Sequence, residues 1–215
     1  PQTALAAVVI SAALSLMDLG ILRRYFQVRK SALALSLVAT AGVVFFGVLQ
    51  GIVVAIVLAI LMFFRRSWWP HGAVLGQVPG IEGWHGIDGH DDAVQIPGIV
   101  VYRWEAPLFF ANVGAFRQQV RHLARTEQPS WIVLQCEAIT DIDVTAADML
   151  RTLDDELNAQ GIHLAFAELR SRLQEQALRY GLLETLDHDH FYPTLTMALD
   201  EVRAEGIERR NEEEP

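Results

Sequence analysis

The chain has 215 residues, of which 52% are hydrophobic, and a formal net charge of −9 at pH 7. Two unlike parts make up this average. Residues 1–66 contain six cations and one acid, for a net charge of +5, whereas residues 67–215 contain 11 arginines, no lysine and 25 acids, for a net charge of −14. The acidic part would repel nucleic acid. The chain has a single cysteine, Cys136, which excludes a disulfide framework and indicates a reducing compartment.

The first part of the chain predicts helices that span a membrane. Residues 1–18 carry one charge and approach the roughly 20 apolar residues that a spanning helix needs, so we expect a first, shortened span there. The chain begins with Pro1 and lacks the basic region and cleavage site of a signal peptide, so we expect a piece of a longer protein. Residues 18–30 mix apolar side chains with four cations, which is typical of a helix lying among lipid headgroups on the cytoplasmic side.

Residues 31–64 form one uncharged run whose helix would be roughly 51 Å long, whereas one crossing needs only about 30 Å. Arginine and lysine flank both ends of the run, and the positive-inside rule places both ends in the cytoplasm. We therefore expect two short spans, 32–47 and 50–65, that need partner helices. The turn is expected between Gly47 and Gly51, although this GxxxG pattern also favours close helix packing without a turn.

Residues 67–97 are rich in glycine, proline and histidine and lack sustained periodicity, so we expect a linker or an irregular lead-in strand. The stretch HGIDGHDD could in principle bind a cation, as could residues 187–190. Flexible ligands without thiols or helical spacing are a weak signal, so we expect solvated loops, with no metal and no cofactor. The side chains concerned in the first stretch are His85, Asp88, His90, Asp91 and Asp92.

From residue 98 onward, apolar runs alternate with amphipathic stretches. The pattern predicts strands at 98–104, 107–110, 131–136, 162–167 and 191–192, and helices at 112–125, 145–159, 173–180 and 195–202. This order predicts an α/β domain over residues 98–206, with a mixed β-sheet and helices packed on it. The remaining residues, 207–215, are expected to form a disordered acidic tail.

The segment Asp143-Val144-Thr145-Ala146 opens the second predicted helix. Asp143 and Thr145 are both N-cap residue types, and Thr145 with Asp148 matches a capping box, so one interpretation is a plain helix cap. The other is a regulatory loop: a phosphate on Thr145 would add about −1.5 to −2 charges beside neighbouring aspartates, changing the loop and its affinity for a partner.

Three stretches together resemble SulP-type sulfate permeases: GVLQGIVVAIVLAILMFFRR, PLFFANVGAFRQQV and IVLQCEAITDIDVTAADML. The resemblance covers nearly the whole chain. It implies a secondary anion transporter that is embedded in membrane lipid and ends in a cytoplasmic STAS domain. It implies that residues 1–64 hold only the final three of fourteen helices, and that sulfate, bicarbonate or a related anion binds helices upstream of Pro1. It also implies a multi-pass protein of the inner membrane that forms a homodimer.

In STAS proteins of the anti-sigma-factor-antagonist type, the loop similar to residues 143–146 reads Asp-Ser-Ser-Gly and is phosphorylated on its second hydroxyl residue. Thr145 holds that position here, whereas Val144 and Ala146 depart from the pattern. The resemblance thus implies a regulatory site for a cytoplasmic protein partner. Two alternatives stay open: a membrane-tethered STAS signalling module, and a nucleotide-binding regulatory domain. The sequence has no P-loop and no nucleophile elbow, and Cys136 lies in a predicted strand, where it is poorly placed as a nucleophile. We therefore expect that the protein is not an enzyme.

Overall fold

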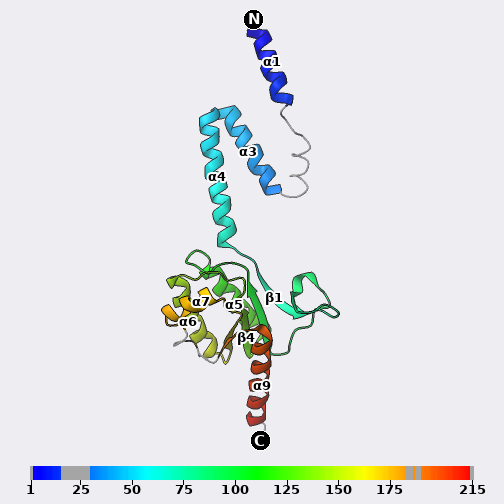
Figure 1. The fold of residues 1–215 in the computed structure, drawn as a ribbon, viewed down its shortest axis with the longest axis vertical. Helices are drawn as coiled ribbons and strands as arrows, with labels where there is room; N and C mark the ends of the chain where they lie inside the picture. Colours follow the sequence, from blue (N-terminus) through cyan, green and yellow to red (C-terminus); the bar gives the residue numbers. More distant parts are fainter. Residues whose placement is uncertain (1, 16–29, 183–185, 187–189, 214–215) are drawn as a thin grey trace. The chain divides into compact units, whose positions relative to one another are not determined.

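A computed structural model describes residues 2–15, 30–182, 186 and 190–213 (Figure 1). The chain forms two compact units, Pro1–Arg65 and Arg66–Pro215. Helices α1 (Gln2–Ser15), α3 (Lys30–Phe46) and most of α4 (Val48–Trp68) make up the first unit. The predicted headgroup helix at 18–30 lies outside the described residues, apart from Lys30 at the start of α3.

Gly47 joins α3 to α4, as the hairpin prediction requires. Its φ of +95° lies in the left-handed region, which glycine enters without steric cost. The Gly47 N–H donates to the Val43 carbonyl at 3.0 Å. Gly51 has the second predicted role, close packing, because a Cβ added there would lie 2.5 Å from the Val43 backbone nitrogen. The glycine pattern therefore both turns the chain and brings the two helices together.

Among the described residues, one helix is long and apolar enough to cross a membrane. It covers Val48–Arg65, 18 residues with a mean hydropathy of 2.5. The shorter apolar helices Thr3–Ala12 and Leu33–Phe46 fall below that length. Many large apolar side chains of this unit are exposed, including Phe45, Leu49 and Phe63.

The second unit is built on a six-stranded mixed sheet with the order β2-β1-β3-β4-β5-β6. Strand β1 (Gly72–Gln77) is antiparallel to both β2 (Trp84–Gly86) and β3 (Ile99–Trp104). From β3 onward the pairing is parallel: β3 with β4 (Trp131–Gln135), β4 with β5 (His163–Ala167), and β5 with β6 (Phe191–Tyr192). Every residue of β4 is buried, as expected for a continuous apolar run at the centre of a parallel sheet.

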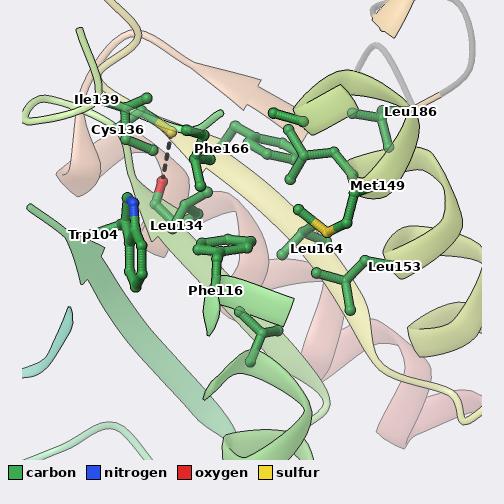
Figure 2. Close-up of a cluster of buried hydrophobic side chains, with 14 of the residues drawn as sticks. Trp104, Phe116, Leu134, Cys136, Ile139, Met149, Leu153, Leu164, Phe166 and Leu186 are labelled. Carbon is green, nitrogen blue, oxygen red and sulfur yellow. Dashed lines mark hydrogen bonds between the residues drawn. The ribbon is translucent and has the colours of Figure 1, made fainter. Parts of the chain in front are cut away.

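Helices cover both faces of this sheet. On one face, α5 (Val113–Glu127), α6 (Val144–Asn158) and α7 (Ser171–Arg179) enclose a core that contains Phe116 and Leu153 (Figure 2). On the other face, α9 (Leu195–Glu213) packs its first two turns over the strands. The predicted α/β class, with a mixed sheet and packed helices, is confirmed.

Two local predictions were wrong, and one open alternative was decided. Residues 107–110 form no strand, only an isolated parallel bridge between Leu108 and Ile142. The linker expected at 67–97 contains β1, β2 and the 3-10 helix η1 (Ile87–Gly89), so the lead-in strand was the better alternative. The tail expected to be disordered continues α9 to Glu213, because glutamate and arginine are good helix formers and extend a helix that packing has already nucleated.

Candidate functional site

The candidate site lies after β4, where α6 begins. Asp143 has extended backbone angles (φ −98°, ψ 174°), and its Oδ1 accepts the Ala146 N–H at 2.8 Å. Asp143 is therefore the N-cap of α6. The capping box expected from Thr145 and Asp148 is wrong, because Thr145 is already the second helical residue and Asp148 pairs instead with Arg151 at 2.8 Å.

The Asp143 carboxylate also holds a second loop, the one that follows β3. Its other oxygen, Oδ2, accepts the Phe110 N–H at 2.8 Å. The backbones join as well, since the Asp143 N–H donates to the Leu108 carbonyl at 3.2 Å and the Leu108 N–H to the Asp141 carbonyl at 3.0 Å. Two loops at the carboxyl ends of neighbouring parallel strands are thus fixed to each other by one side chain and a short backbone bridge.

Asn112, which was not among the predicted site residues, gives the loop after β3 its shape. The side chain is fully buried at the start of α5. Its Nδ2 donates to the Pro107 carbonyl at 2.8 Å, and its Oδ1 accepts the Phe109 N–H at 3.0 Å. An asparagine directly before an amphipathic helix is a cap-type residue, and this signal could have shown that 107–110 is a loop.

Helix α7 contributes the third side of the site. The Gln176 Nε2 donates to Asp141 Oδ1 at 2.5 Å, and its Oε1 accepts the Ile142 N–H at 3.4 Å. An Arg172 Nη2 lies 3.9 Å from the same Asp141 oxygen. The backbone before Asp143 is therefore held from a second direction, and one guanidinium lies close to the aspartates.

The outer surface of the site carries one hydroxyl and two apolar side chains. Thr145 is exposed, and in the described part of the chain no group hydrogen-bonds to its hydroxyl. Val144 is 57% exposed and Phe110 70% exposed, whereas Ala146 is fully buried in the core. Of the four predicted site residues, Asp143 and Ala146 build the structure and Val144 and Thr145 face outward. A phosphate on Thr145 would feel the favourable N-terminal dipole of α6 and the unfavourable charge of Asp143.

Cys136 is a structural thiol. It is buried at the end of β4, and its Sγ–H donates to the Leu134 carbonyl at 3.4 Å (Figure 2). Burial raises the pKa of the Cys136 thiol well above its ordinary value, and the nearby charge of Glu168 raises it further. A thiol that stays protonated is a poor nucleophile, as its place in a strand indicated.

The histidine-rich stretch forms a loop around η1. The His85 Nε2 lies 3.0 Å from the Glu82 carbonyl oxygen, and the His85 and His90 rings meet edge to face. Within the described residues, no group of three His, Cys, Asp or Glu side chains could hold a metal ion. Of the second candidate stretch, residues 187–189 lie outside the described residues.

Comparisons with known proteins match both units of the chain. Residues 92–198 match the family model of the STAS domain. A probable sulfate transporter of Mycobacterium tuberculosis is 42% identical over 205 residues, which is 94% of this chain and 37% of that protein. Probable sulfate transporter 4.2 of Arabidopsis thaliana is 28% identical over 203 residues, 89% of this chain and 30% of that protein. The chain thus spans about a third of the length of these relatives.

A solved structure shows the same fold. Murine Slc26a9, an anion transporter captured in the inward-facing state, matches with a TM-score of 0.71 at 21% identity, over 84% of this chain and 30% of that one. The mycobacterial match covers the apolar helices as well as the sheet domain, and the sheet domain carries the family model. Residues 92–198 therefore belong to the STAS domain family, and nearly the whole chain is similar to part of a probable sulfate transporter.

Proposed function

We propose that this chain is the C-terminal, STAS-bearing part of a secondary transporter for sulfate or a related anion. The observation that carries the proposal is the 42% identity to a probable sulfate transporter, which extends over 94% of the chain and so includes the apolar helices. A tethered signalling module would need only one anchoring helix, not a hairpin joined by close glycine packing.

In this proposal residues 1–18, 32–47 and 50–65 are three spans of a multi-pass inner-membrane protein. The exposed phenylalanines and leucines of α3 and α4 support it, because such surfaces are stable only against lipid or other helices. Helix α3 has 17 residues, or about 25 Å, which is shorter than the hydrocarbon core and therefore needs neighbouring helices. The STAS domain would lie in the cytoplasm, the whole protein would form a homodimer, and the anion would bind upstream of Pro1.

The segment 143–146 would act as the regulatory surface of the domain. Asp143 fixes the backbone on both sides, so a charge added at Thr145 would meet a defined structure rather than a flexible loop. Exposed Phe110 and Val144 lie on the two segments that Asp143 joins and would provide apolar contacts for a cytoplasmic partner.

Transport by the full-length protein tests the first proposal. Purified protein in liposomes should take up radioactive sulfate with saturation, and an excess of unlabelled sulfate should compete. Bicarbonate and chloride, added as competitors, would identify a different preferred anion. If the liposomes took up none of these anions above the level of protein-free vesicles, the transporter proposal would be wrong.

Substitutions at Thr145 test the regulatory proposal separately. Thr145→Glu, which adds charge, should change the uptake rate or the binding of a cytoplasmic partner, whereas Thr145→Ala should stay near wild type in the absence of phosphorylation. Thr152→Glu is the matched control, because Thr152 is exposed on the same helix and its hydroxyl already donates to the Asp148 carbonyl. Equal uptake and partner binding by all of these variants would contradict regulation at Thr145 without affecting the transport proposal.

A further inference from the structure

A cleft of about 600 Å³ opens in the second unit, between α5 and the segment that contains β1 and η1. It shares no residue with the segment 143–146. Its volume lies in the range of ligand sites, about 300–1,000 Å³. Val74 of β1 and Leu123 of α5 form apolar walls, and both are only partly buried.

The floor of the cleft is already paired and therefore fixed. The Tyr102 hydroxyl donates to Gln119 Oε1. Gly72 makes room for this hydroxyl, since a Cβ added at Gly72 would clash with it. Tyr102 is almost completely buried, and burial raises the pKa of its hydroxyl well above the ordinary value, so it remains a hydrogen-bond donor. A ligand would meet a preformed floor that offers no charge.

The rim offers hydrogen-bond acceptors and one aromatic face. Asp88, Gln118 and His122 are exposed there, and they provide a carboxylate, an amide oxygen and an imidazole. Trp69 also lines the cleft, with 67% of its surface exposed. The described residues that line the cleft include no lysine or arginine, so nothing in this lining would neutralise a phosphate or another anion. The Asp88 carboxylate instead favours a ligand that carries a positive charge.

We propose that this cleft binds the guanidinium group of an arginine presented by a partner polypeptide. A guanidinium is planar, so it can stack on the Trp69 indole while its N–H groups donate in the plane to Asp88 and Gln118. A cleft of about 600 Å³ is larger than one compact cation, and its apolar walls fit the residues beside the arginine. The strongly acidic charge of residues 67–215 would attract such a partner. The proposal goes beyond transport and does not depend on the anion.

The experiment uses the full-length protein in lipid nanodiscs, labelled with 5-fluorotryptophan and observed by fluorine NMR. The signal that disappears in Trp69→Phe identifies Trp69. The probe is the tripeptide acetyl-Ala-Arg-Leu-amide, and its twin carries citrulline, the uncharged isostere, in place of arginine. We expect a saturable shift of the Trp69 signal with the arginine peptide and none with the citrulline peptide.

Two variants and one matched control accompany the titration. Asp88→Asn should raise the Kd of the arginine peptide by about tenfold, the scale of one lost charge-assisted contact. Gln118→Lys should abolish binding by placing a like charge on the rim. Asp92→Asn should leave the Kd unchanged, because Asp92 is an exposed acid of the same segment that does not line the cleft.

Several results would overturn the proposal. They are the absence of a saturable shift, an equal response to the citrulline peptide, and an unchanged Kd in Asp88→Asn and Gln118→Lys. Tighter binding of tetramethylammonium than of the arginine peptide would assign the cleft to small organic cations instead. A Trp69 shift that appeared on raising the protein concentration, without peptide, would assign it to a second copy of the chain.

Discussion

Asp143 joins two loops that are 33 residues apart in the sequence, one through each carboxylate oxygen. Asp143→Ala removes both hydrogen bonds, and we expect a loss of stability of about 1–2 kcal/mol, the scale of a lost N-cap. Asp143→Asn keeps a side-chain oxygen for the Ala146 N–H but loses the second acceptor, so its loss should be smaller. Thermal unfolding of the full-length protein in detergent measures both. Equal melting temperatures for wild type and Asp143→Ala would contradict this role.

Asp143 and Asn112 shape the site, and the sequence could predict these two residues to different extents. Asp143 and Thr145 are both cap types, and local sequence could not choose between them. The choice depends on the Phe110 N–H, which reaches Asp143 from another loop. Asn112 was missed because the run PLFF before it has strand composition, which outweighed the cap-type asparagine that follows. The buried amide, bonded to Pro107 and Phe109, holds the backbone in a turn. A long-range partner therefore decided Asp143, whereas the partners of Asn112 lie three and five residues away in its own loop.

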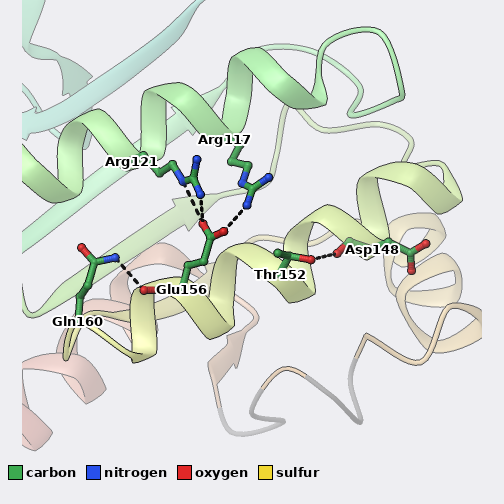
Figure 3. A network of polar contacts seen from close by, with 6 residues as sticks. All are labelled: Arg117, Arg121, Asp148, Thr152, Glu156 and Gln160. Carbon is green, nitrogen blue, oxygen red and sulfur yellow. Dashed lines mark hydrogen bonds and ion pairs between the residues drawn. The ribbon is translucent and has the colours of Figure 1, made fainter.

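Helices α5 and α6 are clamped by one glutamate between two arginines (Figure 3). Arg117 donates to one oxygen of Glu156, while Arg121 donates to the other from Nε at 2.9 Å and from Nη2 at 2.7 Å. The hydrogen bond from Arg117 is the main cause that lowers the pKa of Glu156 below its ordinary value, with Arg121 adding to it. The clamp therefore favours the ionised carboxylate in the folded protein.

This lowered pKa predicts a pH dependence of stability. The clamp stabilises the fold fully above the ordinary glutamate pKa, and its contribution is lost as the pH falls through the lower pKa of the folded state. The melting temperature of wild type should therefore exceed that of Glu156→Gln at neutral pH, and the gap should close in acid. Asp155→Asn, an exposed neighbour on the same helix, should show no such closing gap. A difference in melting temperature between wild type and Glu156→Gln that did not change with pH would mean that the clamp acts through packing alone.

The hairpin of α3 and α4 depends on Gly51 having no side chain. A Cβ there would meet the backbone of Val43, which cannot move aside as a flexible side chain could. Gly51→Val should cost about 1–3 kcal/mol through overpacking. Ala59→Val, at an exposed position of the same helix, is the control and should be tolerated. Detergent-solubilised protein that unfolds at the same temperature for Gly51→Val and Ala59→Val would show that the two helices do not pack closely.

At the level of elements, sequence periodicity predicted most of the STAS domain. Each central strand buries a continuous run of apolar residues, and helices α5, α6 and α9 each bury one apolar stripe. Both patterns can be recognised from residues that are close together in the sequence. Strand β1 was harder, because Gly72 and Gly76 interrupt its apolar pattern and its pairing with β3 is a long-range property. A Cβ at Gly76 would crowd Ile87 and Ala93, so the residue that obscures the strand in the sequence is needed for its packing.

The proposed orientation of the whole molecule can be tested by labelling. Lys30 and Arg65 flank the apolar hairpin, and the positive-inside rule predicts that both lie on the cytoplasmic side. Lys30→Cys and Arg65→Cys should both resist a membrane-impermeant maleimide in intact cells and react after the membrane is opened. Cys136 provides little background, because it is buried and its pKa is raised. Labelling of one position but not the other in intact cells would refute the hairpin.

Helix α9, the last helix described, has a consequence for how the protein is made. Among the described helices, it supplies the residues that cover one sheet face: Leu195, Ala198, Leu199 and Val202. During synthesis, Trp131 and Val133 of the central strand leave the ribosome long before these residues do. The apolar face of the nascent sheet therefore stays exposed until translation has passed Val202. During that interval chaperones can bind the exposed face.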